Sequence, residues 1–130
     1  MPVALRNFVI PYESTFEEKP GYLHARGAGE RTAENMMRFL KEAFDACLQG
    51  GRSRLLLEMW FYGPALDAAS IFRVISDRAP DGAKLGKIAY VESAGADLVQ
   101  SRFAETVAAN RGLNVMLFHD VQAAARWLAQ

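Results

Sequence analysis

Apolar residues recur at helical spacing in four separate segments of this chain. The clearest segment follows Thr32 and ends at Gly50-Gly51. Its apolar stripe consists of Ala33, Met36, Met37, Leu40, Phe44, Cys47 and Leu48. Thr32 is a favourable N-cap, Glu34 suits the positive end of the helix dipole, and glycine commonly ends a helix. The pattern predicts an amphipathic helix between these signals, with the methionine-rich stripe packed in the core.

Three later segments keep the same spacing, and we predict one helix from each. The first ends at Pro80-Asp81-Gly82, the second ends at Arg111-Gly112, and the third follows Asp120 as its N-cap. The positions expected on their packed faces are Ala68, Ile71, Phe72, Ile75 and Ala79 in the first, Val99, Phe103, Val107 and Asn110 in the second, and Val121, Ala124, Ala125 and Leu128 in the third. Trp127 lies beside the last stripe and is expected to seal its edge.

Shorter apolar or alternating runs between these helices predict strands. The predicted strands are residues 3–10, 22–28, 55–57, 87–92 and 113–118. Within residues 22–28, Leu23 and Ala25 alternate with His24 and Arg26, as in a half-buried strand. Residues 12–19 are acidic and polar without a period, so we predict a connection there, followed by a turn at Pro20-Gly21.

The alternation of strands and helices predicts an α/β protein with a mostly parallel sheet and right-handed crossovers. We expect about five strands and four helices in one domain spanning residues 1–130. The helices should lie mainly on one face of the sheet. The N-terminal strand, bounded by Pro11, should lie antiparallel at the edge, where a missing N–H donor is tolerated.

Composition and charge narrow the functional classes. The chain has 130 residues with 15 basic and 15 acidic side chains, so its charge balance gives no reason to expect a nucleic-acid partner. No apolar run approaches the length that spans a bilayer, and the first residues lack the pattern of a signal peptide. The single cysteine excludes an internal disulfide. We therefore expect a cytoplasmic protein without membrane insertion.

Most motifs of enzymes and metal sites are missing. The sequence contains no dinucleotide fingerprint, phosphate loop, HExxH or CxxC motif, and we expect neither a cofactor nor a metal. Cys47 lies on a core stripe and is expected to be a buried, inert thiol. Arg26-Gly27-Ala28-Gly29 is too short for a phosphate loop. Ser93-Ala94-Gly95 could present backbone N–H groups to a phosphate, although a plain strand-to-helix turn is favoured.

The two histidines offer little support for catalysis. His24 lies in the middle of a predicted strand on its polar face, where a solvated or cross-strand role is favoured over a base. His119 lies at the carboxyl end of a strand, where catalytic groups often lie, and Glu92 or Asp97 could pair with it. No nucleophile and base are visibly paired, so we predict that the protein is not an enzyme.

Trp60-Phe61-Tyr62, followed by Gly63-Pro64, forms the most distinctive short segment. We predict an aromatic turn between the central strand and the next helix. Three consecutive aromatic side chains cannot all point inward, so at least one should lie at the surface. Either two of them cover the core and one is half exposed, or the segment is a binding hot spot for a protein or an apolar ligand.

The element order and several segments resemble the STAS domain, the fold of bacterial anti-sigma-factor antagonists. Gly29-Glu30 with Thr32-Ala33 looks like the family's entry to the first helix, at a shorter spacing. Residues 55–58 resemble its apolar strand ending in an acidic residue, and residues 66–71 fall where the family has Asp-Ser-x-Gly-Leu. The C-terminal half looks like a divergent STAS-like branch.

This resemblance implies a β–α superhelix that works by protein contact, without turnover. It also implies a regulatory serine directly after Asp67, whose phosphorylation would block partner docking. Here that position is Ala68, which has no hydroxyl, and Ser70 stands where the family has glycine. We therefore expect a contact surface formed by Trp60, Phe61, Tyr62, Asp67, Ala68 and Ser70, without the family's phosphate switch.

Two further hypotheses follow. The STAS-like fold is similar to lipid-exchange domains of the CRAL-TRIO type, which implies an alternative function as a binder of a small apolar ligand. The side chains expected to line such a pocket are Met36, Met37, Phe44, Phe72 and Phe103. We also predict a homodimer: with the helices mainly on one face, the other sheet face, including Ile88 or Tyr90, needs cover, which a two-fold dimer could supply.

Overall fold

The computed structural model describes residues 12–92 and 97–130, which form one five-stranded sheet with four helices. In chain order the elements are β1 (Tyr12–Lys19), β2 (Tyr22–Glu30), α2 (Ala33–Gln49), β3 (Arg54–Tyr62), α3 (Ala68–Gly82), β4 (Lys87–Glu92), α4 (Leu98–Asn110), β5 (Val115–Phe118) and α5 (Val121–Ala129). The strands lie in sequential order from β1 to β5. β1 is antiparallel to β2, and all other neighbours are parallel, which confirms the predicted fold class.

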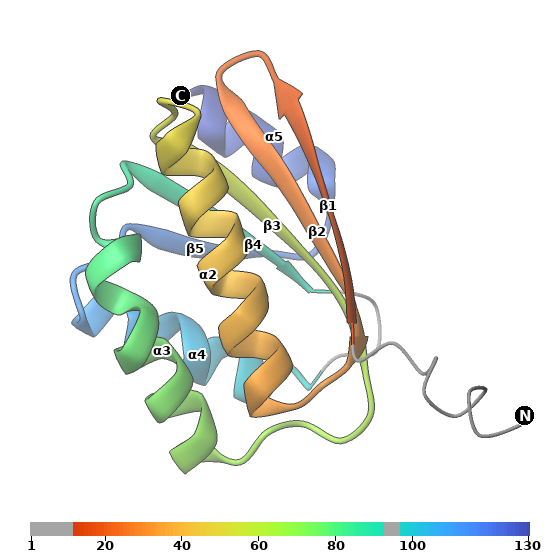
Figure 1. The fold of residues 1–130 in the computed structure, drawn as a ribbon. Helices are drawn as coiled ribbons and strands as arrows, with labels where there is room; N and C mark the ends of the chain where they lie inside the picture. Colours follow the sequence, from red (N-terminus) through yellow and green to blue (C-terminus); the bar gives the residue numbers. More distant parts are fainter. Residues whose placement is uncertain (1–11, 93–96) are drawn as a thin grey trace, which may run out of the picture.

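β1 corrects the prediction that residues 12–19 form a connection. The strand pairs with β2 along its whole length, from Tyr12 opposite Gly29 to Lys19 opposite Tyr22. It lies at the edge of the sheet (Figure 1), where charged side chains are tolerated because one side of the strand faces solvent. Gly21 directly follows Pro20 in the predicted turn and has a φ of +87°. A proline followed by a glycine with positive φ is typical of a type II turn. The predicted strand at residues 3–10 lies outside the described residues.

α2, α3 and α4 cover one face of the sheet (Figure 1). The predicted stripe of α2 packs against it, and Thr32 accepts a hydrogen bond from the Asn35 backbone N–H at 3.1 Å as the expected N-cap. Phe39, absent from the predicted stripe, is fully buried and meets Phe61 with 5.8 Å between ring centroids. Each additional buried aromatic ring contributes a large apolar area to this core.

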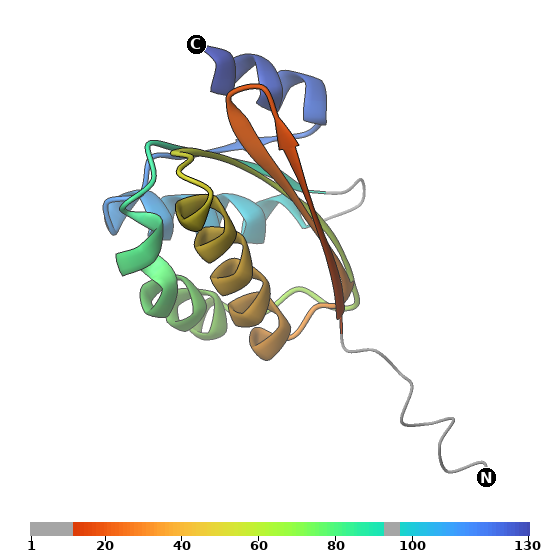
Figure 2. The same cartoon turned by 45° about the horizontal axis from the view of Figure 1, so that its top comes forward.

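Among the helices that the structure describes, α5 is the one on the opposite face (Figure 2), where Ala124 and Leu128 pack on Leu56, Ala89 and Val91. Asp120 is its N-cap, as predicted. Trp127 packs against Phe118, with 5.6 Å between ring centroids, which agrees with its expected place at the edge of this cluster.

Basic side chains fix the carboxyl end of α5 to the sheet. Lys87 Nζ donates to the carbonyl oxygens of Trp127 and Gln130, both at 2.9 Å, and Arg54 donates to that of Leu128. Cations near the last carbonyl groups of a helix are favourable because they satisfy unpaired acceptors and oppose the helix dipole.

Some expected core positions of α3 and α4 are wrong. Phe72 is 47% exposed and Val99 is 76% exposed, whereas Val74 and Ser101 are buried. α3 packs against both α2 and α4, and α4 packs against α3 and β5, so spacing alone misjudges which side faces inward. Pro80 lies inside the last turn of α3, which continues to Gly82, the last residue of the predicted stop signal.

The premise of the predicted sheet-face dimer is also wrong. Ile88 is buried and Tyr90 is partly buried in the core under the helical layer, and neither lies on an uncovered face. Successive residues of a strand point to opposite faces, so the other side of β4 carries Ala89 and Val91, which α5 covers. Within the described residues, no helix is both long enough and apolar enough to cross a membrane.

Candidate functional site

α5 leaves part of its sheet face open over β2 and β3. Alternation along the strands and the pairing of Arg26 with Glu58 and of Ala28 with Trp60 place these side chains on that open face. We define the β2–β3 face as His24, Arg26, Glu58, Trp60 and Tyr62. Trp60 is 45% exposed and Tyr62 is 62% exposed. The expectation that at least one of the three consecutive aromatic residues lies at the surface is therefore confirmed.

Polar contacts hold Trp60 in one orientation. Its indole N–H donates to Glu58 Oε2 at 2.6 Å, and the guanidinium carbon of Arg26 lies 4.9 Å from the centroid of its ring. The cation–π contact acts on the face of the indole ring, and the hydrogen bond to a carboxylate acts on its N–H. Trp60 is thus an exposed aromatic side chain whose rotamer is fixed before anything binds.

Glu58 connects Trp60 to His24. His24 Nε2 donates to Glu58 Oε1 at 2.7 Å, and both side chains are largely shielded from solvent. Burial raises the pKa of Glu58, but the hydrogen bonds from Trp60 and His24 outweigh burial and hold the pKa of Glu58 below its usual value. The predicted cross-strand role of His24 is confirmed, and its partner is a carboxylate that stays charged at neutral pH.

The predicted aromatic turn is wrong in part, because residues 60–62 belong to β3. Because side chains alternate along a strand, Phe61 points to the face of the sheet opposite to that of Trp60 and Tyr62. Phe61 is only 4% exposed and packs in the core with Phe39, so it cannot belong to the predicted contact surface.

The start of α3 has a structural role of its own. Asp67 is the N-cap and accepts a hydrogen bond from the Ser70 backbone N–H at 2.7 Å. This hydrogen bond lowers the pKa of Asp67. Ala68 is exposed and Ser70 is partly buried. α3 lies on the other face of the sheet from Trp60 and Tyr62, so the predicted contact residues are divided between two faces.

Arg31 fixes the ends of β2 and β3 and was missed by sequence reasoning. Its guanidinium donates to the carbonyl oxygen of Phe61 at 2.7 Å and to that of Gly63, while its backbone N–H donates to the Tyr62 carbonyl at 2.8 Å. No pattern in the sequence distinguishes this arginine from the other surface cations. It keeps the exposed end of β3, including Tyr62, in a defined position.

A cavity of about 130 Å³ lies between the helical layer and the sheet. Its walls are mostly apolar and come from α2, β3, α3, β4, α4 and β5. Met36 and Phe44, two of the residues expected to line a ligand pocket, do so. The other three, Met37, Phe72 and Phe103, are not among the lining residues.

Tyr90 and Glu92 are among the polar residues of the cavity wall. The Tyr90 hydroxyl donates a hydrogen bond to Glu92 Oε2. Burial raises the pKa of Glu92, and burial together with the charge of Glu92 raises the pKa of Tyr90 well above its ordinary value. Sequence reasoning considered Glu92 only as a partner for His119, because nothing in residues 87–92 marks a cavity.

The remaining chemical candidates have other roles or lie elsewhere. Asp97 is the N-cap of α4, and Glu92 accepts a hydrogen bond from Tyr90. Within the described residues, neither carboxylate forms a hydrogen bond with His119. Among residues 12–92 and 97–130, no group of three or more His, Cys, Asp and Glu side chains could hold a metal ion. The predicted turn at Ser93-Ala94-Gly95 lies outside the described residues.

Cys47 and Gly27 have structural explanations. Cys47 is fully buried, and burial raises the pKa of its thiol to about 11, which agrees with the expected inert thiol. A Cβ atom at Gly27 would lie 2.9 Å from ring atoms of both Phe39 and Phe61. This glycine therefore permits close packing of α2 on the sheet, which explains it without a phosphate.

Comparison with known proteins identifies the fold alone. No protein-family model and no curated protein matches the chain. Among solved structures, the NMR structure of the protein TM1081 is similar, with a TM-score of 0.52 and 16% sequence identity. The likeness covers 88% of this chain and 87% of that chain, so it extends over nearly the whole domain.

Proposed function

We propose that this chain is a non-enzymatic interaction module that binds a protein partner through the β2–β3 face. The observation that carries the proposal is Trp60, which is exposed on an open part of the sheet and yet held in place by Glu58 and Arg26. Tryptophan, tyrosine and arginine are the residue types most enriched at binding hot spots, and this face presents one of each. A fixed side chain loses little conformational entropy on binding, which favours affinity.

Charge defines the partner further. Glu13 lies opposite Ala28 on β1, and Glu30 lies beside Tyr62, so both exposed carboxylates flank the aromatic centre on the same face. Arg26 stacks on Trp60 and lies opposite Glu58 in the strand register, so Glu13 and Glu30 are the carboxylates at the rim beside the aromatic centre. The complementary surface is an apolar patch bordered by lysine or arginine side chains.

The resemblance to STAS domains supports binding without turnover, and we place the module in the cytoplasm. The family's switch does not transfer, because Ala68 cannot be phosphorylated and Asp67 caps α3. We infer that partner release here does not depend on phosphorylation at the start of α3.

A capture experiment tests this function. The immobilised wild-type protein, the variant W60A/Y62A and the control F72A are incubated with lysate of the source organism. Phe72 is a matched control because it is a similarly exposed aromatic residue on α3 with Arg111 stacked on it at 4.5 Å. The proposal expects a protein that is recovered by the wild type and by F72A but lost with W60A/Y62A, and that then binds as a purified protein. Equal recovery by all three proteins would count against the β2–β3 face.

A further inference from the structure

The cavity under the helical layer has the size of a small ring compound. Its volume of about 130 Å³ is close to the roughly 150 Å³ of an engineered apolar cavity that binds benzene. It is well below the roughly 300–1,000 Å³ of pockets for drug-sized ligands. Leu57, Val74, Ile88 and Leu113 are among its apolar walls. These walls favour a compact apolar body and disfavour a long acyl chain or a charged molecule.

Two buried polar atoms on cavity-lining residues have no hydrogen-bond partner within the described residues. They are Glu92 Oε1 and Arg78 Nε. A buried acceptor or donor without a partner costs free energy, and such atoms are rare in folded proteins. Glu92 already uses its second oxygen to accept from Tyr90, so Oε1 is the atom left for a ligand.

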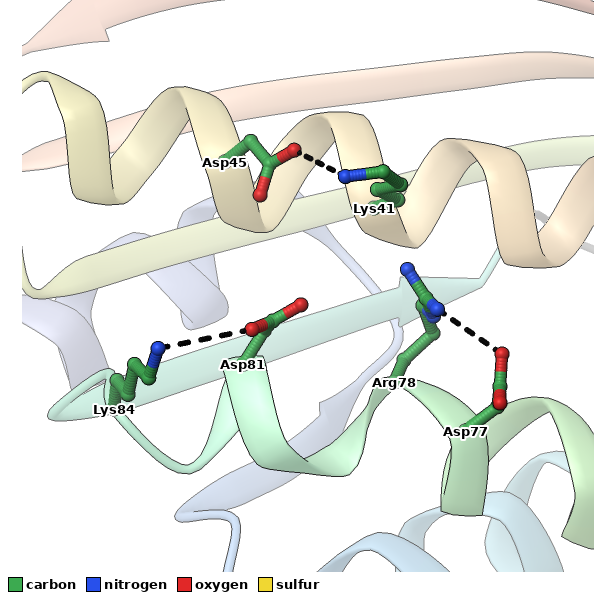
Figure 3. Close-up of polar contacts among 6 residues, drawn as sticks. All are labelled: Lys41, Asp45, Asp77, Arg78, Asp81 and Lys84. Carbon is green, nitrogen blue, oxygen red and sulfur yellow. Dashed lines mark hydrogen bonds and ion pairs between the residues drawn. The ribbon is translucent and has the colours of Figure 1, made fainter.

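Arg78 lies at the helix side of the cavity. Figure 3 shows its side chain extending from α3 toward α2, with Nη2 3.0 Å from Asp77 Oδ2. The neighbouring pairs Lys41–Asp45 and Lys84–Asp81 in the same view lie at the surface and contribute little to stability. Unlike Lys41 and Lys84, Arg78 also contributes to the cavity wall.

We propose that this cavity binds a compact, uncharged molecule of about the size of phenol, whose ring fills the apolar space and whose hydroxyl donates to Glu92 Oε1. A water molecule could donate to Glu92 Oε1, but it would leave the apolar part of the cavity empty. A molecule of the size of phenol both donates to Glu92 and fills the apolar part. The site lies on the opposite side of the sheet from the β2–β3 face and does not depend on the proposed partner binding.

Phenol and toluene are the probes that test this site, because they differ only in the hydroxyl and a methyl group. A purely apolar cavity prefers toluene, since phenol must give up hydrogen bonds to water. A hydrogen bond to Glu92 reverses this order, and we expect the wild type to bind phenol about tenfold more tightly than toluene. Calorimetry gives the affinities, and methyl chemical shifts of Leu57 and Ile88 locate the bound probe.

Matched variants distinguish the cavity from other sites. Ala104 lines the cavity from α4, whereas Ala109 is exposed on the same helix. We expect A104L to lose phenol binding, A109L to keep it, and E92L to prefer toluene. Absence of phenol binding to the wild type, an equal or greater affinity for toluene, or unchanged binding to a folded A104L would each overturn the proposal. If A104L does not fold, wild-type methyl shifts confined to residues outside the cavity would overturn it equally.

Discussion

At the residue scale, Gly27 determines how closely α2 approaches the sheet. A Cβ atom added at Gly27 would lie 2.9 Å from the rings of Phe39 and Phe61, which are both buried. We expect G27A to lower the free energy of unfolding by about 1–3 kcal/mol, because the rings must move out of a packed core. Denaturant unfolding measures this change. The smaller side chain of F39L should relieve the clash, so G27A/F39L should lose less free energy of unfolding than the sum of the losses of G27A and F39L. Strictly additive losses would contradict the assigned clash.

Glu92 gives a prediction about pH. Its pKa in the folded protein is raised from the ordinary value of 4.5 by burial. The folded state therefore binds the Glu92 proton more tightly than the unfolded state does. The free energy of unfolding that this proton contributes is present at low pH and is lost as pH rises through the pKa of Glu92 in the folded protein. Glutamine cannot ionise and can still accept from Tyr90, so E92Q should become increasingly stable relative to the wild type as pH rises above about 4.5.

The measurement is urea unfolding of both proteins between pH 4 and pH 7. E92A is the control, because it removes the charge and also the hydrogen bond to Tyr90. A difference between E92Q and the wild type that does not change with pH would contradict the raised pKa of Glu92.

At the scale of elements, helices and buried strands were predictable and the edge strand was not. Capping at Thr32 and Asp120 and the spacing of apolar residues indicated α2 and α5 correctly, because local interactions decide both. β1 carries almost no apolar pattern, since only Tyr12 is buried. Its identity depends on pairing with β2, which is a long-range interaction that a polar sequence does not reveal.

The length of β3 was underestimated although the sequence carried the signal. From Glu58 to Tyr62, buried Met59 and Phe61 alternate with outward-facing residues, as in a strand with one open face. Counting this alternation would have separated Phe61 from Trp60 and Tyr62. The cavity could not be predicted in the same way, because its walls come from six elements that are distant in sequence.

The separate packing of α5 leads to a prediction at this scale. Leu128 is only 1% exposed and belongs to the cluster between α5 and the sheet. L128A should destabilise the protein by about 2–5 kcal/mol, because it removes apolar contacts and leaves a cavity. Thermal or denaturant unfolding measures the loss. Leu98, which is exposed, supplies the control L98A, and equal effects of the two substitutions would contradict the role of α5 in covering this face.

At the scale of the whole molecule, the two faces of the sheet have different properties. The main core and the cavity lie under the helical layer, whereas on the other face α5, among the described helices, packs mainly on β3, β4 and β5. The chain has no net formal charge, but the open β2–β3 face is bordered by Glu13 and Glu30. Two carboxylates therefore border this face although the net charge is zero, a local arrangement that composition alone could not indicate.

This asymmetry predicts that partner binding depends on salt. Association with a basic patch should be faster at low ionic strength and slow as salt screens the acidic rim. The variant E13Q/E30Q should show a smaller salt dependence of the association rate constant than the wild type, measured by surface plasmon resonance. An identical dependence in both proteins would exclude this rim from the encounter.

The most direct test of the interaction module is the affinity of the purified partner for the wild type, W60A and F72A, measured by calorimetry. If Trp60 is the anchor of the β2–β3 face, W60A should lose at least about 2 kcal/mol of binding free energy, whereas F72A should bind as the wild type does. A W60A protein that is folded and binds with unchanged affinity would contradict the proposed function.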